Sequence, residues 1–404
     1  MNIQRKERGS VLGGVLLVAG SAIGAGMLGL PLVTGHAGFI PSLVIFLFCW
    51  VFMSLTALLL LEVNLFAGKD SNIISMAYQS LGNLGKYISF VVYIFLIYSM
   101  LVAYIDASGI LTRDFFNRTF NFHLSSIEGS LFFALLFGLF VFLGTIFVDR
   151  LNRLFMLGLI LTYILVLFFG ASAVHTEYLQ HRIWGYSLLA IPVVITSFGY
   201  HNIIPTLTSY LHGDKNKMIF VILLGGALPL LIYVLWEWLI LGVVPFQVFQ
   251  TNASFENVLT FVPHSKVSLF SQYFAFFAIV TSFLAQALAL VDFLRDAFRA
   301  KKTIFNRFWL VLLVLIPPFF LAISFPGIFI KALGYVGGFA AIILFVLIPS
   351  FMVWELRYRR KETGHKIVPG GRFTLSCLIF IGFCIMALEL LQELFNLSFL
   401  KQYL

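Results

Sequence analysis

The chain has 404 residues, of which 61% are hydrophobic and only 11% are charged, and its mean hydropathy is +1.01. Soluble domains carry about 45–50% apolar and about 25% charged residues, so this composition excludes an ordinary soluble enzyme, a disordered chain and a fibrous protein. The apolar runs are long and continuous, which also excludes a membrane β-barrel, because barrel strands alternate apolar and polar residues. We therefore expect an all-α membrane protein with many spans.

A membrane-spanning helix needs about 20 mostly apolar residues. Eleven segments satisfy this requirement, and they are 10–34, 38–66, 86–111, 129–148, 153–174, 183–210, 217–243, 267–295, 305–323, 327–355 and 373–397. We group them into a first repeat at 10–174, a second repeat at 183–355 and a final helix at 373–397.

The charges predict an orientation. If residues 1–9 lie in the cytoplasm, 20 of the Lys and Arg residues fall inside and 6 fall outside. An excess of positive charge marks cytoplasmic loops, so we expect a cytoplasmic N-terminus and a periplasmic C-terminus. The basic start leads into an apolar segment that is too long for a signal peptide and has no cleavage-type end. The three Cys residues are scattered and odd in number, which argues against a disulfide framework.

Two spans contain glycine and polar residues at their centre, followed by a proline. The first holds Gly20–Met27 and then Pro31, and the sixth holds Thr196–Asn202 and then Pro205. In a helix interior, each glycine costs roughly 1 kcal/mol and each proline about 3 kcal/mol relative to alanine, and lipid cannot satisfy the freed backbone groups. Five is an odd number, so the second set of five spans must run inverted. Broken helices at equivalent places in inverted halves indicate a binding site near the bilayer midplane.

The broken helices also indicate the chemistry of the ligand. A half-helix that begins at a break presents N–H groups and a positive dipole end, which suit a carboxylate. A half-helix that ends at a break presents carbonyl groups, which suit an ammonium or a metal cation. An α-amino acid carries both groups. The alternative is a small-residue packing face, which accounts for the spacing of Gly20 and Gly24 but not for the second break.

Four stretches of the sequence carry a family resemblance, namely Leu17–Pro31, Leu61–Asn64, Thr196–Pro205 and Thr281–Leu284 with Asp292–Leu294. Through them the chain resembles, over nearly its whole length, the hydroxy/aromatic amino acid permease family. This family contains the bacterial tyrosine and tryptophan permeases and belongs to the amino acid–polyamine–cation superfamily. The resemblance implies the five-plus-five inverted-repeat fold of the sodium-coupled leucine transporters, with helices 1 and 6 broken, in a bacterial inner membrane. It also implies cation-coupled uptake of tyrosine or a related aromatic amino acid.

The expected substrate site lies between the two breaks and includes one residue of the third span. Its candidate residues are Ala22, Gly24, Ala25, Gly26, Met27, Tyr104, Ser197, Phe198, Gly199, Tyr200 and His201. By the resemblance, the Tyr104 hydroxyl would hold the substrate carboxylate, with simple aromatic packing as the alternative. Phe198 and Tyr200 would line an aromatic pocket. His201 would be either a proton carrier, because free histidine titrates near pH 6.5, or a hydrogen-bond donor that closes a gap.

The coupling ion stays open between H⁺ and Na⁺. By similarity to the related fold, a Na⁺ site would use the carbonyls of Gly20, Ile23 and Ala278 and the hydroxyls of Thr281 and Ser282. Close packing of a small-residue stripe on the eighth span is the alternative. The bacterial permeases that the chain resembles are mostly described as proton symporters, which favours the proton.

Asp106 departs from the family pattern, which has a run of small residues at this place in the third span. Ionisable residues inside spans are expensive and usually functional, so Asp106 is a candidate for proton coupling or for binding the substrate amine. The alternative is a water-exposed carboxylate at the outer mouth. Glu62 and Glu237, near the inner end of the second span and the outer end of the seventh, are expected to be gate or network partners rather than ligands.

The loops 67–85 and 244–266 occupy equivalent places in the two halves, and each has a short helical pattern suited to a lid. We find no nucleotide-binding motif, metal cluster or catalytic triad, so we expect no enzymatic activity, no nucleic acid partner and no cofactor beyond the coupling ion. The oligomeric state stays open. We expect a secondary active transporter that binds a small amino acid within the lipid bilayer and works by alternating access. The alternatives are a symporter of another neutral amino acid and, in a different class, a channel or a structural membrane subunit.

Overall fold

The computed structural model describes residues 9–68, 71–252, 258, 265–362, 364 and 366–394. Throughout these ranges all regular secondary structure is helical. In the described part of the chain, ten helices are long and apolar enough to cross a membrane, and the bent pair α1 (Val11–Ala22) and α2 (Gly26–Thr34) makes an eleventh span. The prediction of an all-α protein with eleven spans is confirmed.

The remaining spans of the first half are α3 (Phe39–Ala67), α4 (Ile73–Phe120), α5 (Ser126–Leu143) and α6 (Thr145–Gly170). Helix α4 extends beyond the predicted third span at both ends, because the segment before it is helical from Ile73 and bends at Gly82, where φ is 71°. The short 3-10 turns η1 (Ala171–Ala173) and η2 (Tyr178–Gln180) lead into the second half.

The second half begins with a span made of α7 (Trp184–Ser197), the 3-10 turn η3 (His201–Ile203) and α8 (Ile204–Tyr210). It continues through α9 (Lys215–Val243), the short α10 (Phe246–Asn252), α12 (Ser265–Ala297) and α13 (Ile304–Ser324). The tenth span combines α14 (Phe329–Tyr335), the π-helical η4 (Val336–Leu347), α15 (Ile348–Trp354) and the π-helical η5 (Glu355–Arg359), and α16 (Gly371–Leu394) follows. About half of the predicted 244–266 lid, nearly all of the N-terminal segment 1–9 and the end of the predicted helix 373–397 lie outside the described residues.

The predicted boundary between the fourth and fifth spans is wrong. We expected a polar loop around residues 149–152, but α6 begins at Thr145 and the charged residues lie on its first turns. Asp149 and Arg153 pair on the helix surface at 2.9 Å. The turn consists of Gly144 alone, whose φ of 115° suits a residue without a side chain. Arg307 donates to the carbonyl of Val141 at 2.7 Å and so satisfies an end carbonyl of α5.

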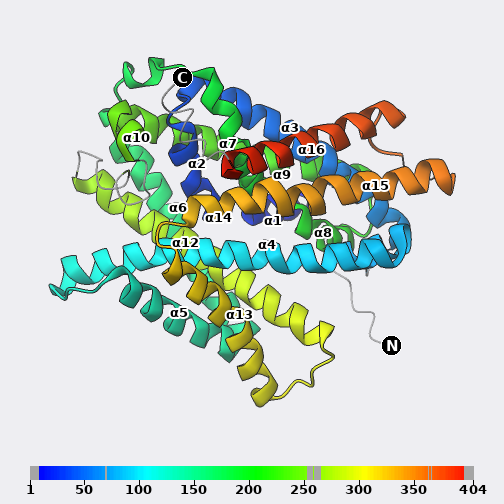
Figure 1. Ribbon diagram of the computed structural model, residues 1–404, viewed down its shortest axis with the longest axis horizontal. Helices are drawn as coiled ribbons and strands as arrows, with labels where there is room; N and C mark the ends of the chain where they lie inside the picture. Colours follow the sequence, from blue (N-terminus) through cyan, green and yellow to red (C-terminus); the bar gives the residue numbers. More distant parts are fainter. Residues whose placement is uncertain are drawn as a thin grey trace.

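The helices form two groups (Figure 1). Helices α4, α5, α6, α12 and α13 pack on one another, and α1, α2, α3, α7 and α9 pack in a second group. The tenth span contacts both groups, through α4 on one side and through α7 and α3 on the other. In the most apolar stretch of the tenth span, 83% of the residues are buried inside the protein. In the corresponding stretch of the fifth span, only 22% are buried. The fifth span is therefore peripheral and offers its apolar side chains to lipid, whereas the tenth lies in the interior.

Both predicted helix breaks are present. In the first span, Ile23 adopts an extended conformation and the two half-helices meet at a bend of 56°. In the sixth span, helix α7 ends at Ser197, and the chain from Phe198 to Tyr200 is not helical. The sequence explains both positions, because glycines at the break weaken the helix and a proline shortly after it cannot supply a backbone N–H.

A buried ion pair joins the second span to the tenth. Arg357 of η5 donates from Nε and Nη2 to both carboxylate oxygens of Glu62 on α3, at 2.6 and 2.5 Å. Both side chains make a further hydrogen bond: Arg357 donates to the carbonyl of Val368, and the N–H of Ile367 donates to Glu62. Both side chains are less than 10% exposed. Glu62 is thus a network partner, as expected.

We predict that Glu62→Gln lowers the free energy of unfolding by about 3–5 kcal/mol, because it leaves the Arg357 charge buried without its partner. Thermal unfolding of the purified protein in detergent measures this loss. The double variant Glu62→Met/Arg357→Met removes both charges and is expected to recover most of the stability. A single variant that melts like the wild type would contradict the prediction.

Candidate functional site

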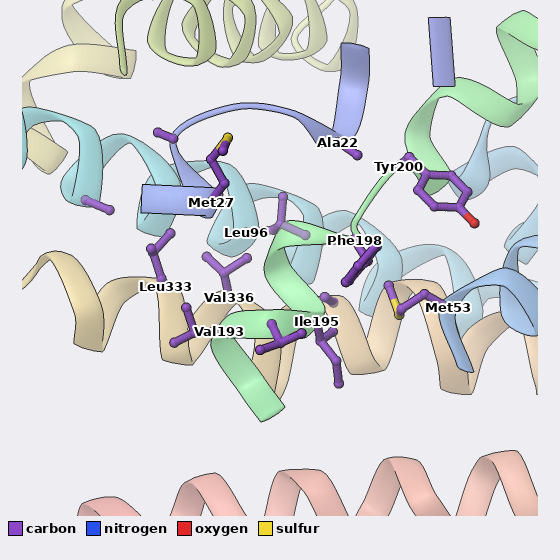
Figure 2. Packing of buried hydrophobic residues seen from close by; sticks show 14 of the residues in the cluster. Ala22, Met27, Met53, Leu96, Val193, Ile195, Phe198, Tyr200, Leu333 and Val336 are labelled. Atoms are coloured by element: carbon purple, nitrogen blue, oxygen red, sulfur yellow. The ribbon is translucent and has the colours of Figure 1, made fainter. Parts of the chain in front are cut away.

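The two breaks lie against each other. Gly26, the first residue of α2, packs on the last residue of α7, and a Cβ atom at this glycine would lie 3.1 Å from the Ser197 hydroxyl oxygen. Figure 2 shows the segment between Ala22 and Met27 passing beside the segment between Phe198 and Tyr200. The residues that the sequence placed on the two broken spans are therefore brought together, and glycine is needed where the chains approach most closely.

A tyrosine from the seventh span joins the ends of the two half-helices. The Tyr233 hydroxyl lies 2.7 Å from the carbonyl oxygen of Ala22, the last residue of α1, and 2.7 Å from that of Ser197, the last residue of α7. A hydroxyl has one proton, so it donates to one carbonyl at a time and the other keeps acceptor capacity for a second donor. The sequence analysis missed Tyr233, because nothing in its local sequence distinguishes it from the other 14 tyrosines.

Hydroxyl groups from the third and eighth spans reach the first break. The N–H of Ala25 donates to the Ser282 hydroxyl at 3.0 Å, and a Cβ atom at Gly24 would lie only 2.5 Å from that oxygen. Tyr104 of α4 is completely buried close to Ser282 and Tyr233. Three hydroxyls from α4, α9 and α12 thus surround the two breaks.

Of the five residues in the predicted Na⁺ site, the hydrogen bonds connect only Ser282 to the first break. The Thr281 hydroxyl points to carbonyls of its own helix, those of Phe277 at 2.8 Å and Ala278 at 3.2 Å. Gly20 is exposed, and Ile23 is partly buried. Coordination of a cation by these oxygens stays a prediction.

Aromatic and apolar side chains line the sixth-span break. Phe198 is fully buried and meets Tyr233 edge to face, with ring centroids 5.1 Å apart. The Tyr200 hydroxyl lies 3.1 Å from that of Ser54 on α3. Met27, the second residue of α2, is also completely buried. The surroundings of the breaks are therefore apolar except for the hydroxyls and the backbone groups.

His201 sits in an apolar stack. Its ring lies nearly parallel to that of Phe345, with centroids 4.7 Å apart and an angle of 7°, and it is completely buried. Nε2 lies 3.0 Å from the Thr56 hydroxyl, which also donates to the carbonyl of Met53, and Nδ1 has no hydrogen-bond partner within the described ranges. These contacts suit a neutral ring that donates one hydrogen bond. Proton carriage by His201 stays a prediction.

Asp106 faces the tenth span rather than the breaks. Its Oδ1 accepts from the N–H of Gly327 at 2.9 Å and its Oδ2 accepts from the N–H of Phe329 at 3.0 Å. These groups belong to the start of α14, where a carboxylate is favoured by the helix dipole. Asp106 is 9% exposed, so it is not an open carboxylate at the mouth. Its contacts describe a helix cap, and a coupling role for it stays a prediction.

The fold matches that of a solved structure. The crystal structure of MhsT in complex with L-phenylalanine superimposes with a TM-score of 0.69 over 96% of this chain and 99% of that one, at 13% sequence identity. This likeness shows the fold of the sodium-coupled leucine transporters, with two inverted sets of five helices, and confirms the predicted architecture. The exact repeat limits at 10–174 and 183–355 stay predictions.

Known relatives cover nearly the whole chain. A tryptophan-specific transport protein of Haemophilus influenzae is 31% identical over 94% of this chain and 95% of its own length. The tyrosine-specific transport system 1 of the same organism is 33% identical over 92% and 94%, and a low affinity tryptophan permease of Escherichia coli is 28% identical over 95% of each chain. The sequence model of the tryptophan/tyrosine permease family matches residues 7–389. The chain belongs to the tryptophan/tyrosine permease family.

Proposed function

We propose that this protein imports tyrosine, tryptophan or a related aromatic amino acid across a bacterial inner membrane by symport with a cation, with the proton favoured over sodium. The relatives are transport proteins named for tryptophan or tyrosine, which supports the substrate class. The observation that carries the proposal is the meeting of two half-helix ends at Tyr233, between the two breaks.

The breaks offer matching partners for both charged groups of an amino acid. The carbonyls of Ala22 and Ser197 share one hydroxyl proton, so the pair can accept a further hydrogen bond from a substrate ammonium. Helix α2 begins at Gly26 with its positive dipole end at the same place, which favours the substrate carboxylate. The Tyr104 hydroxyl is the side-chain donor that we assign to that carboxylate.

The aromatic part of the substrate requires an apolar surface beside these polar groups. Phe198 and Met27 are completely buried, and each belongs to one of the two breaks. An aromatic ring placed against Phe198 gains area burial and edge-to-face contact, in the same geometry that Tyr233 has with Phe198. A polar side chain of similar size gains neither, so the surface favours an aromatic amino acid.

Alternating access requires one group of spans to move against the other. Spans 1, 2, 6 and 7 pack together through α1, α2, α3, α7 and α9, and this is the group that we expect to move. The Glu62–Arg357 pair ties this group to the tenth span at the predicted inner end. Opening toward the cytoplasm therefore involves loss or rearrangement of this contact, which makes the pair an inner gate.

Uptake into proteoliposomes tests the proposal. We expect labelled tyrosine or tryptophan to accumulate when the pH gradient is acid outside, because a proton moves inward with the substrate. Imposing a Na⁺ gradient separately shows whether the Thr281 and Ser282 hydroxyls serve a cation instead. An excess of unlabelled neutral aliphatic amino acid should not compete. Absence of aromatic amino acid uptake under both gradients would refute the assignment.

The Tyr233 hydroxyl has a predicted effect on substrate binding. Tyr233→Phe removes the hydroxyl that holds the two half-helix ends in place for the substrate, and loss of a contact worth about 1–3 kcal/mol is expected to weaken binding by roughly 5- to 150-fold. Equilibrium binding of a labelled aromatic amino acid measures the change. Tyr98→Phe is the matched control, because the Tyr98 hydroxyl also donates to a helix carbonyl, that of Leu313, outside the site. Equal binding by the wild type and Tyr233→Phe would contradict the role of Tyr233.

A further inference from the structure

Helix α9 carries a carboxyl group one turn after Tyr233. Glu237 is completely buried within the span. Among the residues that the structure describes, no Lys, Arg or His forms an ion pair with it. An ionised carboxylate without a cation is very costly inside a membrane protein. The environment of Glu237 therefore differs from that of Glu62, which has a bidentate arginine partner.

The hydrogen bonds around Glu237 fit a protonated carboxyl group. Its Oε1 is hydrogen-bonded to the Thr34 hydroxyl, but that hydroxyl also lies 2.7 Å from the carbonyl of Leu30. The nearby Ser42 hydroxyl donates to the carbonyl of Gly38 at 2.7 Å, and the Oε2 of Glu237 has no hydrogen-bond partner in the described part of the chain. If both hydroxyl protons go to these carbonyls, the carboxyl group must supply the proton of its bond to Thr34.

The position of Glu237 links it to the substrate site. Thr34 is the last residue of α2, the half-helix that begins at the first break. Tyr233 binds the last residue of α1, so two side chains of α9, four residues apart, hold both halves of the broken span. A change in the charge of Glu237 alters its contact with α2, and α2 carries the N–H end that faces the substrate.

A small cavity lies near the ends of α2 and α9, and Glu237 is not among the residues that line it. Its volume is about 10 Å³, close to the space for one water molecule, and its lining includes Gly35 and Gly38, which flank α2 and α3, and Leu241, one turn beyond Glu237. It lies on the side predicted to be outside. Titratable groups on the elements around Glu237 and the cavity include Tyr178, His181, Tyr186, His36 and Tyr233. They also include Tyr163, whose hydroxyl donates to the carbonyl of Ile232 on α9, and His175, whose backbone N–H donates to that of Gly242. The lining contains no Asp, Glu, Lys or Arg.

We propose that Glu237 is the proton-binding group that couples transport to the pH gradient. A proton from the outer side forms the O–H bond on Oε1 and is donated to the Thr34 oxygen, which holds α2 against α9 while substrate is bound. After inward opening the O–H bond breaks and the proton leaves to the cytoplasm, one proton for each substrate. Ionised Glu237 requires water, which favours separation of α2 from α9 and the outward-open state. This inference rests on the proposed function and names its coupling group.

Glu237→Gln in the full-length protein tests the inference, because glutamine keeps the size and can still donate to Thr34. In proteoliposomes the variant is expected to retain exchange of labelled for unlabelled aromatic amino acid. It is expected to lose accumulation driven by a pH gradient. The wild type should bind substrate more weakly as pH rises, by up to about tenfold per pH unit for one linked proton, whereas binding by the variant should not change with pH.

Glu389→Gln is the matched control. Glu389 is also a buried carboxyl group within a span, but it packs against Gly334 of the tenth span, away from the breaks. The control is expected to accumulate substrate like the wild type. The inference is overturned if Glu237→Gln accumulates substrate under a pH gradient as the wild type does, or if Asp106→Asn alone removes the coupling.

Two measurements on the wild type separate this inference from the proposed function and do not depend on folding of a variant. Addition of substrate should make the outer medium more alkaline, because protons enter with it. If the outer pH does not rise while aromatic amino acids are still exchanged, the role of Glu237 alone is overturned. Complete absence of aromatic amino acid exchange would refute the proposed function itself.

Discussion

A backbone group freed inside a membrane must find its partner within the protein, and this constraint governs the centre of the molecule. The breaks in the first and sixth spans release carbonyl groups that lipid cannot bind. One hydroxyl, that of Tyr233, lies within hydrogen-bond distance of the last carbonyls of both α1 and α7. The remaining features of the site follow from this arrangement, because the breaks must lie close together and their contact surfaces must be small. Gly24 and Gly26 meet the second requirement, since a Cβ atom at either would press on a serine hydroxyl.

Among the described residues, four carboxyl groups are buried, and they have different roles. Glu62 has an arginine partner and joins two spans, while Asp106 binds two N–H groups at the start of a helix. Glu389 packs against a glycine of the tenth span. Only Glu237, of these four, combines complete burial with a position on the helix that holds both halves of the first span. Location relative to the breaks, rather than burial alone, distinguishes a coupling group from a structural one.

The sequence predicted the class of protein, the span count and both breaks, because these depend on local composition. Glycine, polar residues and a following proline weaken a helix wherever they occur, so the breaks were visible at Gly20–Met27 and Thr196–Asn202. The cap formed by Asp106 was not predictable in the same way, since its partner Gly327 is 221 residues away and the start of α14 has no strong signal. Tyr233 was hidden, and Glu237 was named only as a gate or network partner, because the role of each depends on which face of α9 meets the first span. The α5–α6 boundary failed for a simpler reason: a single glycine replaced the polar loop that a turn normally shows.

That single glycine also bears on how the chain enters the membrane. Successive Cα atoms are about 3.8 Å apart, so the ends of α5 and α6 on either side of Gly144 cannot separate by more than a few ångströms. The one-residue connection is too short for one helix to reach its final depth in the bilayer while the other remains outside. We therefore expect the two helices to enter the bilayer together, so that the depth of one end fixes the depth of the other. Arg307 of α13 donates to the carbonyl of Val141 beside the same turn, so the depth of α13 is tied to that of α5 and α6.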